Sequence, residues 1–148
     1  MSEHHIELVW ARDGGPFERG NYRREHAIHF QGGQTLLNSA ASGYGGDASA
    51  SNPEELLAAS LATCHMLTFL AVAANRGYTV ERYEDHAVAI LAKNADGVMA
   101  VTKVVLAPKV GFSGDKQPNA EDYARMQERA HAACFIANSV KTEVELRL

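Results

Sequence analysis

The sequence predicts an α+β protein in which small antiparallel sheets surround one long central helix. Three observations lead to this fold class: a long apolar stretch with helix signals at both ends, strand-like segments on either side of it, and a second helical pattern near the C-terminus. The predicted order of elements is β-β-β-α-β-β-α-β. The length of 148 residues and the 46% apolar content fit a single domain spanning residues 1–148.

The central helix is expected within residues 52–77. Asn52 can cap a first turn that holds a proline and two glutamates, and Gly77 suits the left-handed conformation in which helices commonly end. Residues 56–74 carry no charge, so we expect this helix to be buried nearly all round, by sheet and by a second subunit. Its Ala, Ser and Thr content and its lack of basic flanks favour a core helix over a membrane span.

The N-terminal third has the pattern of a small antiparallel sheet. Apolar and alternating segments, separated by Gly-rich turns, predict strands at 6–11, 22–30 and 35–39. Residues 42–51 have the composition of a flexible loop directly before the central helix.

The C-terminal half predicts a long hairpin, a helix and a last strand. Residues 78–93 and 98–110 are rich in Val, Ile and Ala and are separated by a turn at 94–97. Residues 142–148 alternate as a half-buried strand requires. An amphipathic helix that ends at or just before Cys134 is predicted by apolar residues at steps of 3, 4 and 3, namely Tyr123, Met126, Ala130 and Ala133.

The charge pattern argues against several classes of partner. The chain has 14 basic and 18 acidic residues and no basic run, so a nucleic-acid partner is not expected. Its N-terminus lacks the apolar region of a signal peptide, so we expect a cytoplasmic protein without a membrane partner.

Two cysteines are the residues best suited to chemistry. Cytosolic thiols are normally reduced, and the plainest interpretation of Cys64 and Cys134 is that they are small buried apolar residues. Both are flanked on one side by small residues, however, which would let another group approach. A reactive Cys64 should have a cation nearby to lower its pKa, and the candidates are Arg19, Arg23, Arg24, His65 and His131.

The histidines have structural roles as their simplest interpretation. We expect His65 to be a buried helical residue bonded to a carbonyl, and His131 to be a partly exposed residue at a helix end. Zinc binding by Cys64, His65, His131 and Cys134 is an alternative of suitable chemistry. Adjacent helical residues point about 100° apart, which makes Cys64 and His65 poor joint ligands.

The chain resembles the OsmC/Ohr family of osmotically induced and organic hydroperoxide resistance proteins. The matching segments are N-P-E-E-L-L-A-A-S-L-A-T-C-H at 52–65, A-H-A-A-C-F-I-A-N-S-V at 130–140 and the closing strand, and the resemblance extends from Trp10 onward. It implies an intertwined homodimer that reduces hydroperoxides without metal or cofactor. Cys64 would become a sulfenic acid, Cys134 would resolve it as a disulfide, and a dithiol of lipoyl type would reduce that disulfide.

The resemblance also implies two polar site residues. The first glutamate of N-P-E-E is Glu54, and the family arginine fits Arg24 best. Arg23 is adjacent on the opposite face of the expected strand, and Arg19 matches the arginine loop of some members, so all three remain candidates.

Helix geometry constrains the role of Glu54. Ten residues of straight helix separate Glu54 from Cys64, which is ~15 Å along the axis. We therefore expect Glu54 to serve the Cys64 of the partner subunit, unless the helix bends. Glu55 would then be the capping-box partner of Asn52.

The substrate and the rival functions stay open at this point. Apolar residues could line a pocket for organic hydroperoxides, although core packing is their more general role; they are Leu57, Leu61, Met66, Phe69, Phe135 and Ile136. The rivals are a redox-sensing or small-molecule-binding module of the same fold and a Cys/His zinc-binding protein.

Overall fold

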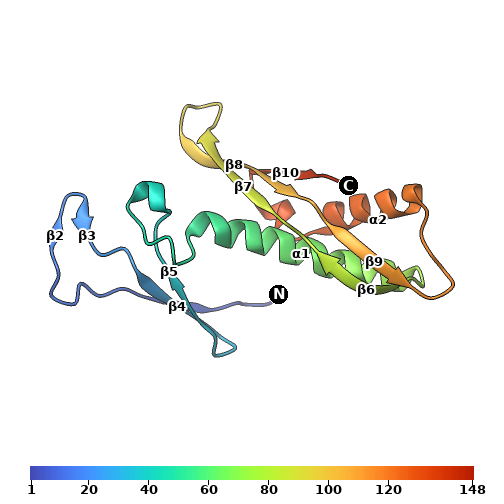
Figure 1. Cartoon of the computed structure of the whole chain (residues 1–148), viewed down its shortest axis with the longest axis horizontal. Coiled ribbons are helices and arrows are strands. Elements are labelled where there is room, and N and C mark those ends of the chain that lie inside the picture. The colour runs from blue at the N-terminus through green and yellow to red at the C-terminus, as the bar shows by residue number, and fades with distance from the viewer. The chain divides into compact units, whose positions relative to one another are not determined.

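The computed structural model describes residues 1–148 and divides the chain into two compact units, Met1–Leu56 and Leu57–Leu148. The elements are labelled in Figure 1, and each unit is described by itself. Together they confirm the α+β class, with antiparallel sheets and one long helix.

The first unit contains one three-stranded sheet and a separate small hairpin. The sheet has the antiparallel order β1-β4-β5, formed by β1 (Ile6–Val9), β4 (His26–Phe30) and β5 (Thr35–Asn38). The small hairpin pairs β2 (Phe17–Glu18) with β3 (Asn21–Tyr22). The loop before the central helix contains one short 3₁₀ turn, η1 (Ser42–Tyr44).

The single strand expected at 22–30 is wrong, because β3 ends at Tyr22 and β4 begins only at His26. Between these two strands, side chains and not a neighbouring strand bond to the backbone carbonyls. The Arg24 guanidinium donates to the Tyr22 carbonyl at 3.0 Å, and His26 Nδ1 donates to the Arg24 carbonyl at 2.8 Å. Arg23 and Arg24 therefore lie on a connection, and opposite strand faces do not distinguish them.

The central helix α1 (Pro53–Asn75) has the boundaries that its sequence predicts. The Asn52 side chain accepts from the Glu55 N–H at 3.0 Å, and the Glu55 carboxylate accepts from the Asn52 N–H at 3.2 Å, which completes a capping box. At the other end Gly77 has a φ of 75°, and the Tyr78 N–H bonds to the Ala73 carbonyl at 3.0 Å.

Burial of α1 is narrower than expected. The chain buries a single stripe of this helix, while Leu67 on another face is 58% exposed; the buried residues are Ala58, Leu61, His65, Phe69 and Ala73. One sheet layer and one further helix cannot surround a helix, so burial nearly all round is not reached within one chain. By length and composition α1 could also cross a membrane, a test that the core helices of soluble proteins pass as well.

The second unit confirms the long hairpin and adds a parallel strand. The hairpin joins β7 (Val88–Lys93) to β8 (Met99–Leu106), and its outer ends pair as β6 (Thr79–Glu84) and β9 (Lys109–Ser113). The helix α2 (Ala120–Ala133), the turn η2 (Ala137–Ser139) and β10 (Glu143–Leu146) follow. Strand β10 pairs with β8 in parallel, because the chain crosses over through α2 before it re-enters the sheet.

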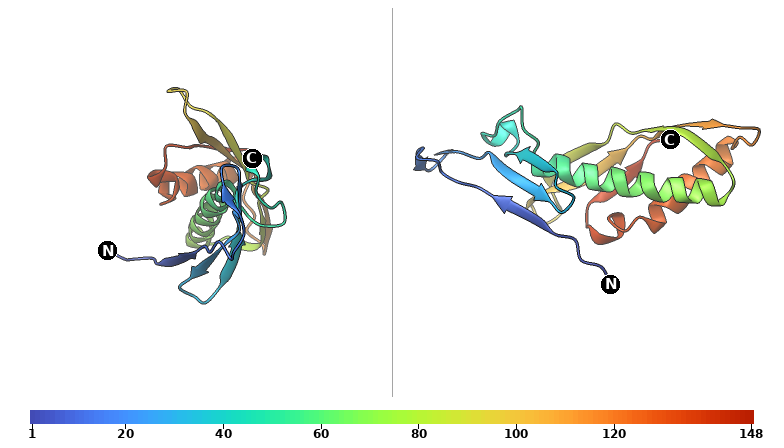
Figure 2. Two further views of the ribbon diagram at one scale, coloured as in Figure 1. Left: turned by 90° about the vertical axis from the view of Figure 1, so that its left-hand side faces the viewer. Right: turned by 90° about the horizontal axis from the view of Figure 1, so that it is seen from below.

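Two apolar clusters hold the second unit together. In the first, Ala58 and Leu61 of α1 pack on Val104 and Leu106 of β8. In the second, Phe69 and Ala73 of α1 meet residues of α2, namely Met126 and Ala130. Figure 2 shows α1 and α2 on the same side of the strands. This packing brings the middle of α1 toward the C-terminal end of α2.

Candidate active site

The structure brings the two cysteines together. Cys64 is half-buried in the middle of α1, and Cys134 is the residue that ends α2 and is 1% exposed. Both are free thiols, and their side chains are near enough that each shifts the pKa of the other. The pairing of these residues, which the family resemblance implies, is therefore geometrically available.

The segment after Cys134 is fixed by several hydrogen bonds. The Cys134 N–H donates to the His131 carbonyl at 3.2 Å, and the Ala137 N–H points at the Cys134 sulfur at 3.5 Å. The Asn138 side-chain amide donates to the carbonyls of Ala132 and Cys134, at 3.1 and 2.9 Å. These bonds hold the second thiol in one place at the end of the helix.

The two sulfurs have pKa values shifted in opposite directions. Burial raises the pKa of Cys64, but the Cys134 thiol and the backbone N–H groups of Ile136 and Phe135 stabilise its thiolate and lower the pKa on balance. Burial and the neighbouring Cys64 sulfur both raise the pKa of Cys134. Of the two thiols, Cys64 is therefore the one that ionises more readily.

No cation contributes to the lowered pKa of Cys64, which comes from the Cys134 thiol, from two backbone N–H groups and, least, from the Thr68 side chain. His65 does not supply the charge either, since burial lowers the pKa of its ring and keeps it neutral. Within the second unit, polar N–H and S–H groups take the place of the expected positive charge.

The histidines have the structural positions predicted for them. His65 is 1% exposed, and its Nε2 donates to the side-chain Oε1 of Gln127 at 2.7 Å, so its partner is an amide side chain and not a backbone carbonyl. His131 is half-buried near the end of α2. No group of three or more His, Cys, Asp or Glu side chains gathers in a geometry that could hold a metal ion.

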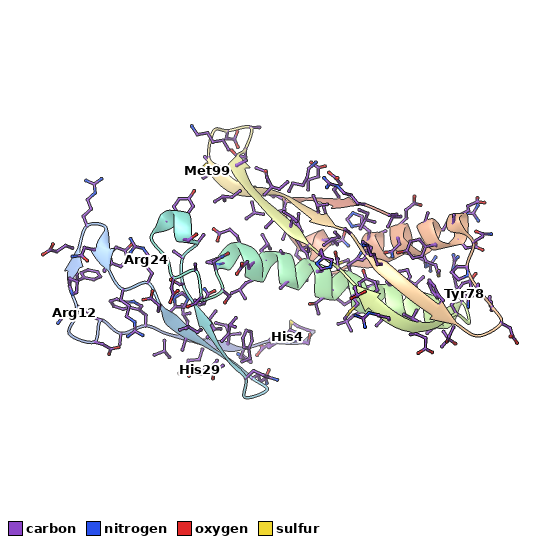
Figure 3. The ribbon with its side chains drawn as sticks, in the orientation of Figure 1. His4, Arg12, Arg24, His29, Tyr78 and Met99 are labelled. Atoms are coloured by element: carbon purple, nitrogen blue, oxygen red, sulfur yellow. The ribbon has the colours of Figure 1, made fainter.

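Arg24 lies in the first unit and has no carboxylate partner. Its guanidinium stacks 4.3 Å from the ring centroid of Tyr22 and donates only to backbone carbonyls, those of Tyr22 and Gly20. Arg23, in contrast, is ion-paired with Asp13 and with Glu25. Figure 3 labels Arg24 beside the β2–β3 hairpin.

The Arg24 guanidinium faces an aromatic cavity within the same unit. The cavity has a volume of about 700 Å³, and its walls include Trp10, Phe17, Tyr22 and Tyr44. Tilted aromatic contacts connect Trp10 to Phe17 and Phe17 to Tyr22, at centroid distances of 6.0 and 5.7 Å. A cation without a counter-ion at an aromatic cavity is suited to bind or polarise an oxygen-containing ligand.

Glu54 also lies in the first unit, and one oxygen of its carboxylate is buried without a hydrogen-bond partner. Glu55 is the capping-box partner of Asn52, as predicted, whereas the role of Glu54 stays a prediction. Arg24 and Glu54 thus belong to one unit, and the cysteines belong to the other.

Most of the apolar residues that were considered for a pocket are in or near the core. Leu61 and Phe69 are fully buried, and Leu57 and Ile136 pack against the first apolar cluster. Phe135 is the exception, because its side chain is 82% exposed beside the cysteines.

Two features of the site were not predicted from the sequence. The backbone N–H groups of Phe135 and Ile136 carry no sequence signal, since any residue provides them. Gln127 did have a sequence signal, because it is a polar residue four positions after Tyr123 on the predicted apolar face. In the structure it is completely buried.

Comparison with known proteins places the chain in a family. A family model described as OsmC-like protein matches residues 46–148, so the chain belongs to the OsmC family. The structure of the OsmC-like protein VCA0330 from Vibrio cholerae is 44% identical and superposes with a TM-score of 0.96, covering 99% of both chains. The YmaD protein of Bacillus subtilis is 26% identical, over 100% of this chain and 94% of its own.

More distant structures share the fold. An organic hydroperoxide resistance protein from Legionella pneumophila is 19% identical with a TM-score of 0.70, covering 99% of this chain and 96% of its own. OhrB of Bacillus subtilis, also an organic hydroperoxide resistance protein, is 19% identical with a TM-score of 0.63. These two likenesses show that the fold is shared.

Proposed function

We propose that the protein is a thiol-dependent peroxidase that reduces organic hydroperoxides, and also hydrogen peroxide, to alcohols or water. The observation that carries this proposal is the asymmetric thiol pair: Cys64 with a lowered pKa and Cys134 with a raised one, in mutual reach. A thiolate next to a protonated thiol is the arrangement that peroxide attack followed by disulfide formation needs. The family's peroxide-resistance members agree with it.

In the first step the Cys64 thiolate attacks the peroxide oxygen that carries hydrogen. The O–O bond breaks, Cys64 becomes a sulfenic acid, and the alkoxide leaves and is protonated to the alcohol. In the second step the Cys134 sulfur attacks the Cys64 sulfur and displaces hydroxide, which leaves as water with the thiol proton. A dithiol of lipoyl type then returns both thiols to the reduced state. The chemistry of these steps needs no metal or cofactor, and a reducing compartment such as the cytoplasm would supply the dithiol.

Arg24 and Glu54 would complete the site from the partner subunit of a homodimer. Both arginines line the aromatic cavity, and Arg24 is favoured because it has no carboxylate partner, whereas Arg23 is ion-paired with Asp13 and Glu25. Helix α1 is continuous from Pro53 to Asn75, so Glu54 is ~15 Å along the axis from the Cys64 of its own chain. Its unpartnered carboxylate oxygen leaves it free to hold a guanidinium.

An apolar organic hydroperoxide is the substrate class that we favour. The exposed Phe135 ring and the aromatic cavity beside Arg24 both offer apolar surface to the carbon body of such a peroxide.

The test is the intact mass of the reduced protein before and after one equivalent of an organic hydroperoxide, under non-reducing conditions. Wild type should lose two hydrogens, Cys134→Ser should gain one oxygen that a sulfenic-acid trap captures, and Cys64→Ser should not change. An unchanged wild-type mass would overturn the proposal.

Steady-state consumption of peroxide with a dithiol separates a peroxidase from a redox sensor. A peroxidase turns over many times with each peroxide class that it accepts, whereas a sensor forms the disulfide and then stops. Replacing Arg24 with Lys, which keeps the charge but not the planar donor geometry, should lower the rate of the first step by about 10- to 100-fold if the guanidinium orients the peroxide. The matched control is Arg23→Lys, which we expect to react at the wild-type rate.

A further inference from the structure

A chain of buried hydrogen bonds joins α1 to α2 beside the cysteines. His65 Nε2 lies 2.7 Å from Gln127 Oε1, Gln127 Nε2 lies 3.0 Å from the Tyr123 hydroxyl, and that hydroxyl lies 3.1 Å from the Pro108 carbonyl. His65 and Gln127 are 1% and 0% exposed. The proposed peroxidase chemistry uses none of these groups.

The direction of every bond in this chain is determined by its last member. The Pro108 carbonyl can only accept, so the Tyr123 hydroxyl uses its hydrogen there. Its oxygen is then the acceptor for the Gln127 Nε2–H, which turns Gln127 Oε1 toward His65. His65 must therefore donate from Nε2. A chain with one possible arrangement can fix the relative position of the two helices.

These helices are the elements that carry the two thiols. His65 directly follows Cys64, and Gln127 precedes Cys134 by seven residues, which is about two turns and therefore the same face of α2. Apart from a T-shaped contact between the rings of Phe69 and Tyr123, the other contacts between the helices are apolar and non-directional. They involve Phe69, Ala73, Met126 and Ala130. The hydrogen bond between His65 and Gln127 is thus the buried polar contact between the two helices, and its geometry is directional.

We propose that Gln127, acting through His65, is a positioning residue for disulfide formation: it holds α2 in the register that brings the Cys134 thiol to the Cys64 sulfur. This inference rests on the proposed peroxidase function. Formation of the S–S bond, with loss of hydroxide from Cys64 and of the proton from Cys134 as water, requires a close approach of the two sulfurs. Attack of Cys64 on a peroxide does not require it.

The inference is tested by timing the two steps separately in Gln127→Met, a variant of similar length without polar atoms. Both steps are followed after mixing with an organic hydroperoxide at a pH at which Cys64 is fully ionised, so that a change in its pKa does not enter. Loss of the Cys64 thiolate should keep its wild-type rate. Disulfide formation should be slower by about 10- to 100-fold, as a misplacement of the order of an ångström produces. The equilibrium of the disulfide with a reference dithiol should shift toward the reduced protein.

Two further variants keep the test decisive if Gln127→Met folds poorly. Tyr123→Phe retains the ring in the aromatic cluster but removes the hydroxyl link, and we expect a smaller slowing of disulfide formation. Met126→Leu is the matched control, since it alters the neighbouring buried position and leaves the polar chain intact. Its disulfide should form at the wild-type rate.

Three outcomes would overturn the inference. Wild-type rates of disulfide formation in Gln127→Met and Tyr123→Phe would show that the polar chain only satisfies buried groups. Equal slowing in Met126→Leu would assign the effect to apolar packing. A wild-type protein that forms no disulfide with peroxide would contradict the proposed function itself, and this result is distinct from the other two.

Discussion

At the scale of single residues, the reactivity of Cys64 depends on hydrogen-bond donors. Its thiolate is stabilised, against the effect of burial, by the Cys134 thiol, by two backbone N–H groups and, least, by the Thr68 side chain. The Cys134 thiol is the largest of these contributions, and it can be removed by mutation. The pKa of Cys64 is therefore directly linked to the identity of residue 134.

We predict that Cys134→Ala raises the pKa of Cys64. The lowered pKa keeps Cys64 ionised at lower pH than an ordinary cysteine, so removal of the donor should move the pH profile of its alkylation and of its thiolate absorbance to higher pH. Cys134→Ser retains a hydroxyl donor and should shift the profile less. A profile that is unchanged in Cys134→Ala would contradict this prediction and assign the stabilisation to the backbone N–H groups and Thr68.

At the scale of elements, helix α1 depends on the bonds at its ends. Its N-terminus is closed by reciprocal hydrogen bonds between Asn52 and Glu55. This capping box also fixes the first turn of the helix, which contains Glu54. It therefore fixes the position of the carboxylate that we assign to the active site. The N-terminus of α1 therefore contributes both to the stability of the helix and to the position of Glu54.

We predict that Asn52→Ala lowers the free energy of unfolding by about 1 kcal/mol, because one N–H at the start of α1 loses its acceptor. Urea denaturation of wild type and variant measures this difference. Asn52→Asp keeps a side-chain oxygen at the same place and should unfold close to the wild-type midpoint. Equal losses in both variants would mean that the amide group has a role other than capping.

At the scale of the whole molecule, α1 has more apolar surface than one chain buries. Only one stripe of the helix is covered, and Leu67 is 58% exposed on an element that carries no charge between residues 56 and 74. Exposed apolar surface of this kind is typical of a subunit interface. The homodimer that we propose would cover it.

We predict that the protein sediments with twice the 16.0 kDa mass of its chain, and that Leu67→Glu shifts the equilibrium to monomer. A buried carboxylate without a partner is costly at an apolar interface. Glu128→Lys, at an exposed position of α2, is the control and should remain dimeric. A wild-type protein of monomer mass would remove the dimer, and with it the assignment of Glu54 and Arg24 to the partner's Cys64.

The sequence by itself determined the elements whose causes are local. The cap at Asn52, the glycine at the end of α1 and the alternation of the last strand are read from neighbouring residues, and the structure has these elements where they were predicted. The capping role of Glu55 was also accessible, because the residues around it have a local capping pattern, and the two cysteines were singled out because they lie in segments with a clear family resemblance.

Only the tertiary structure decided features that depend on contacts between distant segments. The break of the expected strand after Tyr22 follows from side chains that bond to its carbonyls, and the thiolate-stabilising groups at Cys64 come from a segment about 70 residues away. Gln127 was visible as a polar residue on an apolar helix face, but its partner on α1 was not. Such pairings have no local signal, because long-range contacts are selected by the packing of the whole chain.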